Sequence, residues 1–284
     1  MKLALTIQTP EVPAQVPVAL LSGTLAEKLK KAARMGATGV ELITTEPTSL
    51  DVPGLQRQLD RNGLQAAAIA SGGMAFAVKL TLLHSDPSIS ALACQRLDEM
   101  INLAAALHAP VVTVGSFRGR LVTDKERSLV ELARILRHAG ERAAVAGVCI
   151  ALEPLNRFEG DLLNNVAQGL AFLEEVNQPA VGLLVDTFHV NIEESSWTEP
   201  FRQAAQAGKL FHVHLGDNNR LPPGHGLIDF KAILFALKES GYTGWLSAEL
   251  LGKPDPDMAG EQTIDYMFRL MKEVAPVSAS QVQA

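Results

Sequence analysis

The chain repeats one simple unit eight times: a short apolar run suited to a buried strand, then a stretch with the apolar spacing of a helix. Such units in succession build a parallel sheet, and eight of them are the number that closes into a (β/α)8 barrel. No linker rich in Pro, Gly or Ser interrupts the series. The sequence therefore predicts a single TIM barrel over residues 1–274, followed by a flexible tail at 275–284 that is rich in Ser, Gln and Ala.

The expected elements can be given by number. The strands are 3–7, 39–42, 64–70, 110–114, 148–153, 182–186, 210–214 and 244–249. The helices are 26–35, 52–62, 88–107, 124–146, 163–176, 198–206, 230–240 and 260–273. Residues 71–85 and the segment that follows the sixth strand are expected to be loops.

Four consecutive strands end in a side chain that can bind a metal: Glu153, Asp186, His214 and Glu249. A carboxylate at the end of a buried strand is costly unless a cation lies opposite, and no strand supplies a Lys or Arg at the matching position. In a barrel the carboxyl ends of these four strands converge on one another. An open doubly wound sheet is the alternative fold, and there the four ends would converge less naturally. A ligand set rich in oxygen with one imidazole predicts one divalent ion, of Mn, Co or Mg.

Two histidines, His212 and His214, lie two residues apart on the seventh strand. Because side chains alternate along a strand, both are expected to point into the barrel. His214 is nearer the carboxyl end and is the better ligand. We expect His212 to be a hydrogen-bonded histidine of the core, one layer deeper.

Charge and hydropathy exclude several classes of partner. The net charge of −6 argues against a nucleic-acid partner, because affinity for DNA depends on neutralising phosphates. No run of 18 or more apolar residues predicts a membrane span, and the apolar start is too short for a signal peptide. Two cysteines give no disulfide framework. We expect a cytoplasmic protein without a membrane partner.

Five further polar residues are expected on loops at the carboxyl ends of the strands. Glu159, His189 and Arg220 follow the fifth, sixth and seventh strands, and each could instead be a solvated surface residue. Arg118 and Arg120 follow the fourth strand in a turn flanked by glycines. Two guanidinium groups at the rim of a pocket suit a carboxylate or a phosphate, although surface ion pairs are the plain alternative.

Four segments, 152–159, 186–194, 212–220 and 247–249, resemble the sugar phosphate isomerase/epimerase superfamily of xylose isomerase-like TIM barrels. Within it they are most similar to ketose 3-epimerases of the D-tagatose/D-psicose type and to related keto-sugar-acid epimerases. The resemblance implies one divalent metal, with Mn expected and Co or Mg as alternatives, on the four strand-end ligands. It also implies substrate-binding roles for Glu159, His189 and Arg220.

The resemblance further implies a metal-dependent epimerase that acts on a keto-sugar or a keto-sugar acid through a metal-bound enediolate. Glu153 and Glu249 would act as the two opposed acid/base groups, because inversion removes a proton from one face of the carbon and returns it to the other. The partner would be a small carbohydrate, and a homodimer and a homotetramer both stay open. The aromatic floor of the ketose epimerases is not evident in the N-terminal half, so the sugar itself stays open.

Three alternatives remain at this point. A metal-dependent aldose–ketose isomerase would use the same ligands. An endonuclease acting on abasic DNA shares the fold, but it would need further His and Asp ligands and a basic face. A non-catalytic sugar-binding protein is disfavoured, because both candidate acid/base glutamates are present.

Overall fold

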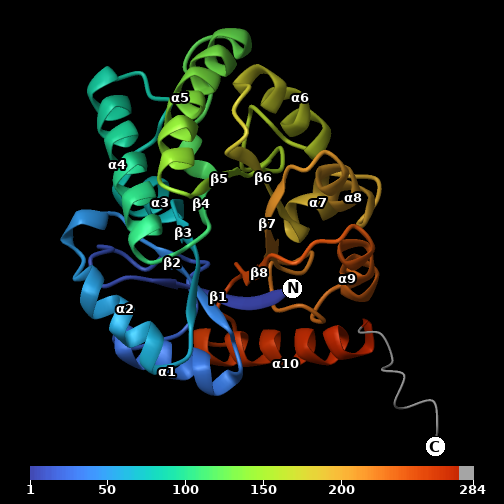
Figure 1. Cartoon of the computed structure of the whole chain (residues 1–284). Helices are drawn as coiled ribbons and strands as arrows, with labels where there is room; N and C mark the ends of the chain where they lie inside the picture. The colour runs from blue at the N-terminus through green and yellow to red at the C-terminus, as the bar shows by residue number, and fades with distance from the viewer. Residues whose placement is uncertain (275–284) are drawn as a thin grey trace, which may run out of the picture.

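The computed structural model of the protein describes residues 1–274, and the expected tail at 275–284 lies outside the described residues. Eight strands close into a barrel in chain order, each parallel to its neighbours, with the first paired to the last (Figure 1). The strands are β1 Lys2–Gln8, β2 Gly39–Ile43, β3 Gln65–Ala70, β4 Val111–Val114, β5 Cys149–Leu152, β6 Val181–Asp186, β7 Leu210–Leu215 and β8 Trp245–Ala248. The predicted (β/α)8 barrel is therefore confirmed.

Helices surround the barrel, and in Figure 1 they form an outer ring around the strands. They are α1 Leu25–Met35, α2 Val52–Arg61, α3 Gly72–Val78, α4 Pro87–Ala106, α5 Lys125–Val145, α6 Val166–Val176, α7 Thr187–Glu193, α8 Glu199–Gln206, α9 Phe230–Glu239 and α10 Pro256–Val274. Two short 3-10 turns, η1 Pro47–Ser49 and η2 Ser116–Arg118, lie between them. Among the described helices, none combines the length and the apolar character needed to cross a membrane.

Side-chain caps determine where several of these helices begin. Thr24 and Glu27 form a reciprocal capping box at the start of α1, which ends at Gly36 in the left-handed conformation. Asp124 caps α5 and Asp229 caps α9, each by accepting a hydrogen bond from a backbone N–H of the first turn. These local signals explain why the observed bounds fall close to the expected ones.

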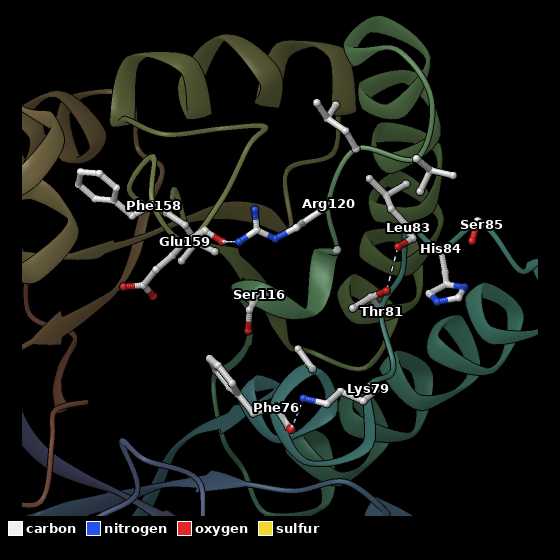
Figure 2. A pocket seen from close by; sticks show the side chains of 15 residues that line it. Phe76, Lys79, Thr81, Leu83, His84, Ser85, Ser116, Arg120, Phe158 and Glu159 are labelled. Carbon is white, nitrogen blue, oxygen red and sulfur yellow. Dashed lines mark hydrogen bonds between the residues drawn. The ribbon is translucent and has the colours of Figure 1, made fainter.

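Two segments that were expected to be loops contain short helices. The first is α3, which follows β3 and lies, with η2, around a cavity at the carboxyl end of the barrel (Figure 2). The second is α7, which begins directly after β6 because Asp186 accepts a hydrogen bond from the N–H of Phe188 at 2.8 Å. Helices of seven residues are too short to show a helical period, so the sequence pattern did not reveal them.

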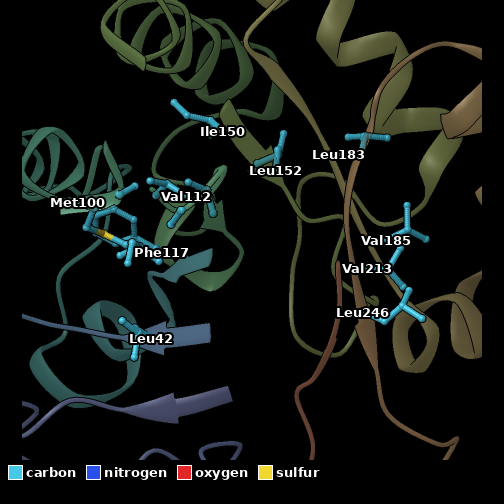
Figure 3. Packing of buried hydrophobic residues seen from close by; sticks show 14 of the residues in the cluster. Leu42, Met100, Val112, Phe117, Ile150, Leu152, Leu183, Val185, Val213 and Leu246 are labelled. Carbon is cyan, nitrogen blue, oxygen red and sulfur yellow. The ribbon is translucent and has the colours of Figure 1, made fainter. Parts of the chain in front are cut away.

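The hydrophobic core lies mainly between the strands and the helices. Figure 3 shows part of it, with Val112 of β4 and Val213 of β7 among the strand residues and Met100 contributed by α4. Val213 belongs to this outer shell, whereas His212 and His214 form hydrogen bonds across the barrel interior. The alternation along β7 therefore places apolar side chains outside and imidazoles inside.

Candidate metal centre and active site

The four predicted metal ligands meet at the carboxyl end of the barrel. Asp186 is the last residue of β6, His214 lies in β7, and Glu153 and Glu249 directly follow β5 and β8. Asp186 and His214 are partners in the register of β6 and β7, so their side chains are neighbours. One ligand atom from each of the four residues lies within 4.8 Å of the others. The structure thus brings together all four strand-end side chains.

Three atoms at the centre of this cluster have no hydrogen-bond partner in the part of the chain that the structure describes. Among residues 1–274, Glu153 Oε1, Asp186 Oδ2 and His214 Nδ1 are buried and have no hydrogen-bond partner. His214 Nδ1 lies 3.5 Å from Glu249 Oε2 and 3.7 Å from Glu153 Oε1. Buried polar atoms without partners are costly. Three carboxylates and one imidazole, aimed at one point, fit a divalent cation of the Mn, Co or Mg type.

The electrostatics of the cluster agree with this fit. Burial, together with the charge of Glu153, raises the pKa of Asp186 to about 8. Burial also raises the pKa of Glu153, and the neighbouring Glu249 adds to the effect. Burial would raise the pKa of Glu249 as well, but His214 and Arg220 outweigh it and hold that pKa at about 2. Three carboxylates this close favour their ionised forms together only when a positive charge lies among them.

A fifth polar residue, Glu41 in β2, lies beneath the cluster and was missed by the sequence analysis. It is fully buried, with Oε1 3.0 Å from His214 Nε2 and Oε2 2.8 Å from His212 Nε2. His212 Nε2 also lies 3.0 Å from Ser247 Oγ, so its prediction as a hydrogen-bonded core histidine is confirmed. Although burial opposes it, the two histidines hold the pKa of Glu41 well below its usual range.

The sequence carried one weak signal for Glu41, a single carboxylate inside an apolar strand. Its partners lie about 170 residues away and meet it only across the closed barrel. The register between β2 and β3 shifts between Val40 and Glu41. Such irregularities re-aim a side chain, and none can be read from the alternation of apolar residues.

His189 is buried over the cluster, on α7 rather than on the expected loop. Its Nε2 lies 3.6 Å from Glu153 Oε1 and 3.8 Å from Asp186 Oδ2. The backbone N–H of Asn156 donates to His189 Nδ1, and the side-chain nitrogen of Asn156 lies 2.8 Å from the same atom. Since Nδ1 accepts, the ring proton is on Nε2 and points into the site. Burial lowers the pKa of His189 to about 3, so the ring is neutral.

Arg220 and Glu159 form a pair at the edge of the site. Arg220 Nη1 lies 2.9 Å from each carboxylate oxygen of Glu159, and Nη2 lies 3.4 Å from Glu249 Oε2. The guanidinium group also lies over the ring of Phe188, 4.6 Å from its centroid. These contacts bring together the two residues that the sequence analysis expected on separate loops.

The expected position of Arg118 at the pocket rim is wrong. The side chain is 1% exposed, and its guanidinium group donates to the backbone carbonyls of Glu153 and Leu163. The 3-10 turn η2 directs the side chain back towards the end of β5, where burial lowers its pKa to about 10. Arg120, in contrast, is exposed near the rim and donates to the carbonyl oxygen of Glu159 at 2.9 Å.

Comparisons with known proteins agree with this architecture. A family model described as "Xylose isomerase-like TIM barrel" matches residues 29–273. An L-ribulose 3-epimerase of Mesorhizobium japonicum is 34% identical over 221 residues, which cover 74% of this chain and 70% of that protein. A ketose 3-epimerase of Arthrobacter globiformis is 32% identical over 219 residues, which cover 76% of this chain and 74% of that protein. A solved structure of L-ribulose 3-epimerase matches with a TM-score of 0.80 at 26% identity, over 99% of this chain and 98% of that one.

The two sequence relatives are epimerases, which are isomerases, in agreement with the expected class of enzyme. The similarity extends from α1 into α10 and includes the strand ends that carry the four clustered side chains. The protein belongs to the xylose isomerase-like TIM barrel family.

Proposed function

We propose that the protein is a divalent-metal-dependent epimerase of a keto-sugar. The observation that carries the proposal is the placement of Glu153 and Glu249 against one small cavity. They follow β5 and β8, strands separated by β6 and β7 around the barrel, so their carboxylates approach the cavity from different sides. Inverting a carbon centre needs one group to remove a proton and another to return it to the opposite face.

The ligands proposed for the cation are Glu153, Asp186, His214 and Glu249, with Mn as the expected metal and Co or Mg as alternatives. When bound, the cation would act as a Lewis acid towards the carbonyl group of the sugar and so make the neighbouring C–H more acidic. The unpartnered oxygen and nitrogen atoms of the cluster support this ligand set.

The protein's own groups would then move the proton. One glutamate takes it from the substrate carbon, and the other donates a proton to the opposite face. Proton transfer by a positioned carboxylate contributes about 10²–10⁴-fold to the rate. Each glutamate would therefore be both a metal ligand and an acid/base group.

His189 and Arg220 would position the substrate. The Nε2–H of His189 points into the site and would donate to a substrate oxygen, as would Arg220, and fixed donors of this kind stabilise growing negative charge. Glu159 accepts from Arg220 through both oxygens, so we propose that it holds the guanidinium group in place beside the substrate.

The experiment is proton exchange in D₂O. Protein loaded with Mn is incubated with a panel of ketoses and keto-acids, and NMR follows deuterium at each carbon. We expect deuterium at the carbon next to the carbonyl, together with the appearance of the epimer. Formation of an aldose would identify an aldose–ketose isomerase instead. No exchange with any sugar under Mn, Co or Mg loading would overturn the proposal.

A further inference from the structure

A second, larger cavity opens beside the metal-ligand cluster. Its volume is about 630 Å³, within the range of about 300–1,000 Å³ that is usual for small-molecule sites. The walls come from α3, the segment after it, η2 with the residues that follow, and the loop after β5 (Figure 2). We call it the outer cavity, and the small space that Glu153, His214 and Glu249 line is the inner cavity.

The two cavities adjoin each other. Both are lined by Phe76, Ser116, Leu155 and Glu159. The inner cavity holds only about 30 Å³, room for roughly two water-sized groups, since one such group needs about 10–15 Å³ on this measure. A sugar whose reacting atoms enter the inner cavity must therefore extend past these shared residues into the outer one.

The wall of the inner cavity offers a further polar contact for a ligand. Ser71 is 1% exposed and lines the inner cavity, and its Oγ has no hydrogen-bond partner among residues 1–274. A buried hydroxyl without a partner is costly, and a substrate hydroxyl would satisfy it. Ser71 therefore points to a ligand that passes this position.

Basic groups gather around the outer cavity, as Figure 2 shows for Lys79, His84 and Arg120. Lys79 Nζ donates to the carbonyl oxygen of Phe76 at 3.1 Å, and Arg120 Nη1 lies 3.9 Å from Asp161 Oδ2. His84 Nδ1 accepts from the N–H of Asp86, which leaves a proton on Nε2 for donation.

The acidic neighbours of these donors, Asp161 beside Arg120 and Asp86 beside His84, do not line the outer cavity. Of the described residues that line the outer cavity, one is acidic, Glu159, and Arg220 already occupies both of its oxygens. Apolar side chains complete the wall, including Phe76 and Phe158, which are 49% and 76% exposed. The outer cavity therefore combines a positive lining with surfaces for the carbon skeleton of a ligand.

We infer that the substrate is a keto-sugar derivative whose far end carries an anionic group, a carboxylate or a phosphate, held in the outer cavity by Lys79, Arg120 and His84. The inference rests on the proposed function and specifies the class of substrate. A guanidinium or ammonium group recognises either anion through charge-assisted hydrogen bonds. A neutral sugar end would bring no negative charge of its own to Lys79 and Arg120.

The backbone of Lys79 adds support. Its φ of 58° and ψ of 31° are left-handed, a conformation that favours glycine at the end of a helix such as α3. A lysine at this position carries strain that glycine would not. A strained charged residue at the wall of a cavity agrees with a role for its side chain.

The test compares neutral and anionic substrates. Exchange in D₂O gives kcat/KM for a neutral ketose, its terminal carboxylate and its terminal phosphate, with the wild type and with Lys79→Gln and Arg120→Gln. Loss of a charged hydrogen bond predicts a fall of about 10-fold or more on the anionic substrates. We expect less than about 3-fold on the neutral ketose, because it has no anion to lose. Lys30→Gln, on the exposed face of α1, is the matched control.

Three results distinguish the possibilities. If the variants lose more kcat/KM on the substrate with the carboxylate than on the one with the phosphate, or the reverse, the difference identifies the anion. The inference is overturned if the two variants lose kcat/KM equally on neutral and anionic substrates. It is also overturned if the wild type has no higher kcat/KM for the anionic substrates.

If no sugar exchanges at all, the proposed function fails, and calorimetry then tests the outer cavity alone with sorbitol, gluconate and sorbitol 6-phosphate. Tighter binding of an anion than of sorbitol, lost in Lys79→Gln and Arg120→Gln, supports the inference. Equal binding of all three overturns it.

Discussion

Oε1 of Glu41 in β2 lies 3.0 Å from Nε2 of His214 in β7, so a buried carboxylate reaches across the barrel to the histidine of the candidate metal site. A histidine that donates from Nε2 keeps the lone pair of Nδ1 for a metal. Nδ1 is the atom that faces Glu153 and Glu249. The contact therefore fixes both the orientation of the ring and the nitrogen that points into the cluster.

The first prediction concerns this contact. Glu41→Gln should weaken Mn binding by about 10- to 100-fold, the usual cost of losing the partner of a ligating histidine. Calorimetry with Mn measures the affinity without any assay of activity. Glu46→Gln, at an exposed position shortly after β2, should bind Mn like the wild type. Equal affinities for the Glu41 variant and the wild type would contradict an orienting role.

The second prediction concerns the metal itself. We expect about one divalent ion per chain after loading, measured by elemental analysis, and loss of activity after treatment with EDTA that added Mn restores. Asp186→Ala should lose most of the affinity for Mn, because the cation then keeps three of its four protein ligands. Full activity in protein stripped of metal would contradict the proposed mechanism.

The third prediction separates the two acid/base groups. Glu153→Gln and Glu249→Gln should each lower turnover by about 10²–10⁴-fold while some bound metal remains. One of the two variants should still exchange a substrate proton with D₂O, because the carboxylate that remains can act on one face. NMR of each epimer, offered separately, shows which face each glutamate serves. Substantial epimerisation by both variants would favour another pair of residues.

The fourth prediction tests the buried position of Arg118. Arg118→Ala leaves the carbonyls of Glu153 and Leu163 without their donor, so the free energy of unfolding should fall by about 2–4 kcal/mol. Arg120→Ala, at an exposed position two residues away, should change it by less than about 0.5 kcal/mol. Urea denaturation measures both. Similar values for the two variants would show that Arg118 does not support the end of β5.

The fifth prediction concerns the strained backbone of Lys79. Lys79→Gly should be more stable than Lys79→Ala by about 1 kcal/mol, because only glycine adopts the left-handed conformation without strain. Both variants remove the same charge and should lose the preference for anionic substrates to the same extent. Thermal unfolding of the two proteins gives the comparison. A less stable glycine variant would mean that the position carries no strain.

The sequence by itself determined the barrel and the four clustered side chains. Each strand is a local apolar run, and each of Glu153, Asp186, His214 and Glu249 stands at or beside the end of such a run. The carboxyl ends of parallel strands in a barrel face the same way. Local pattern and elementary topology were therefore enough to predict that these four residues meet.

Only the tertiary structure decided the roles of residues whose partners are distant in the chain. Glu41 forms hydrogen bonds with His212 and His214 across the closed barrel. Arg118 points back into the protein from a 3-10 turn that the apolar periodicity of the sequence does not predict. The outer cavity likewise combines segments that follow three different strands. Apolar periodicity records which face of an element is buried, but it does not record which buried polar groups pair, because pairing depends on the closed geometry of the whole barrel.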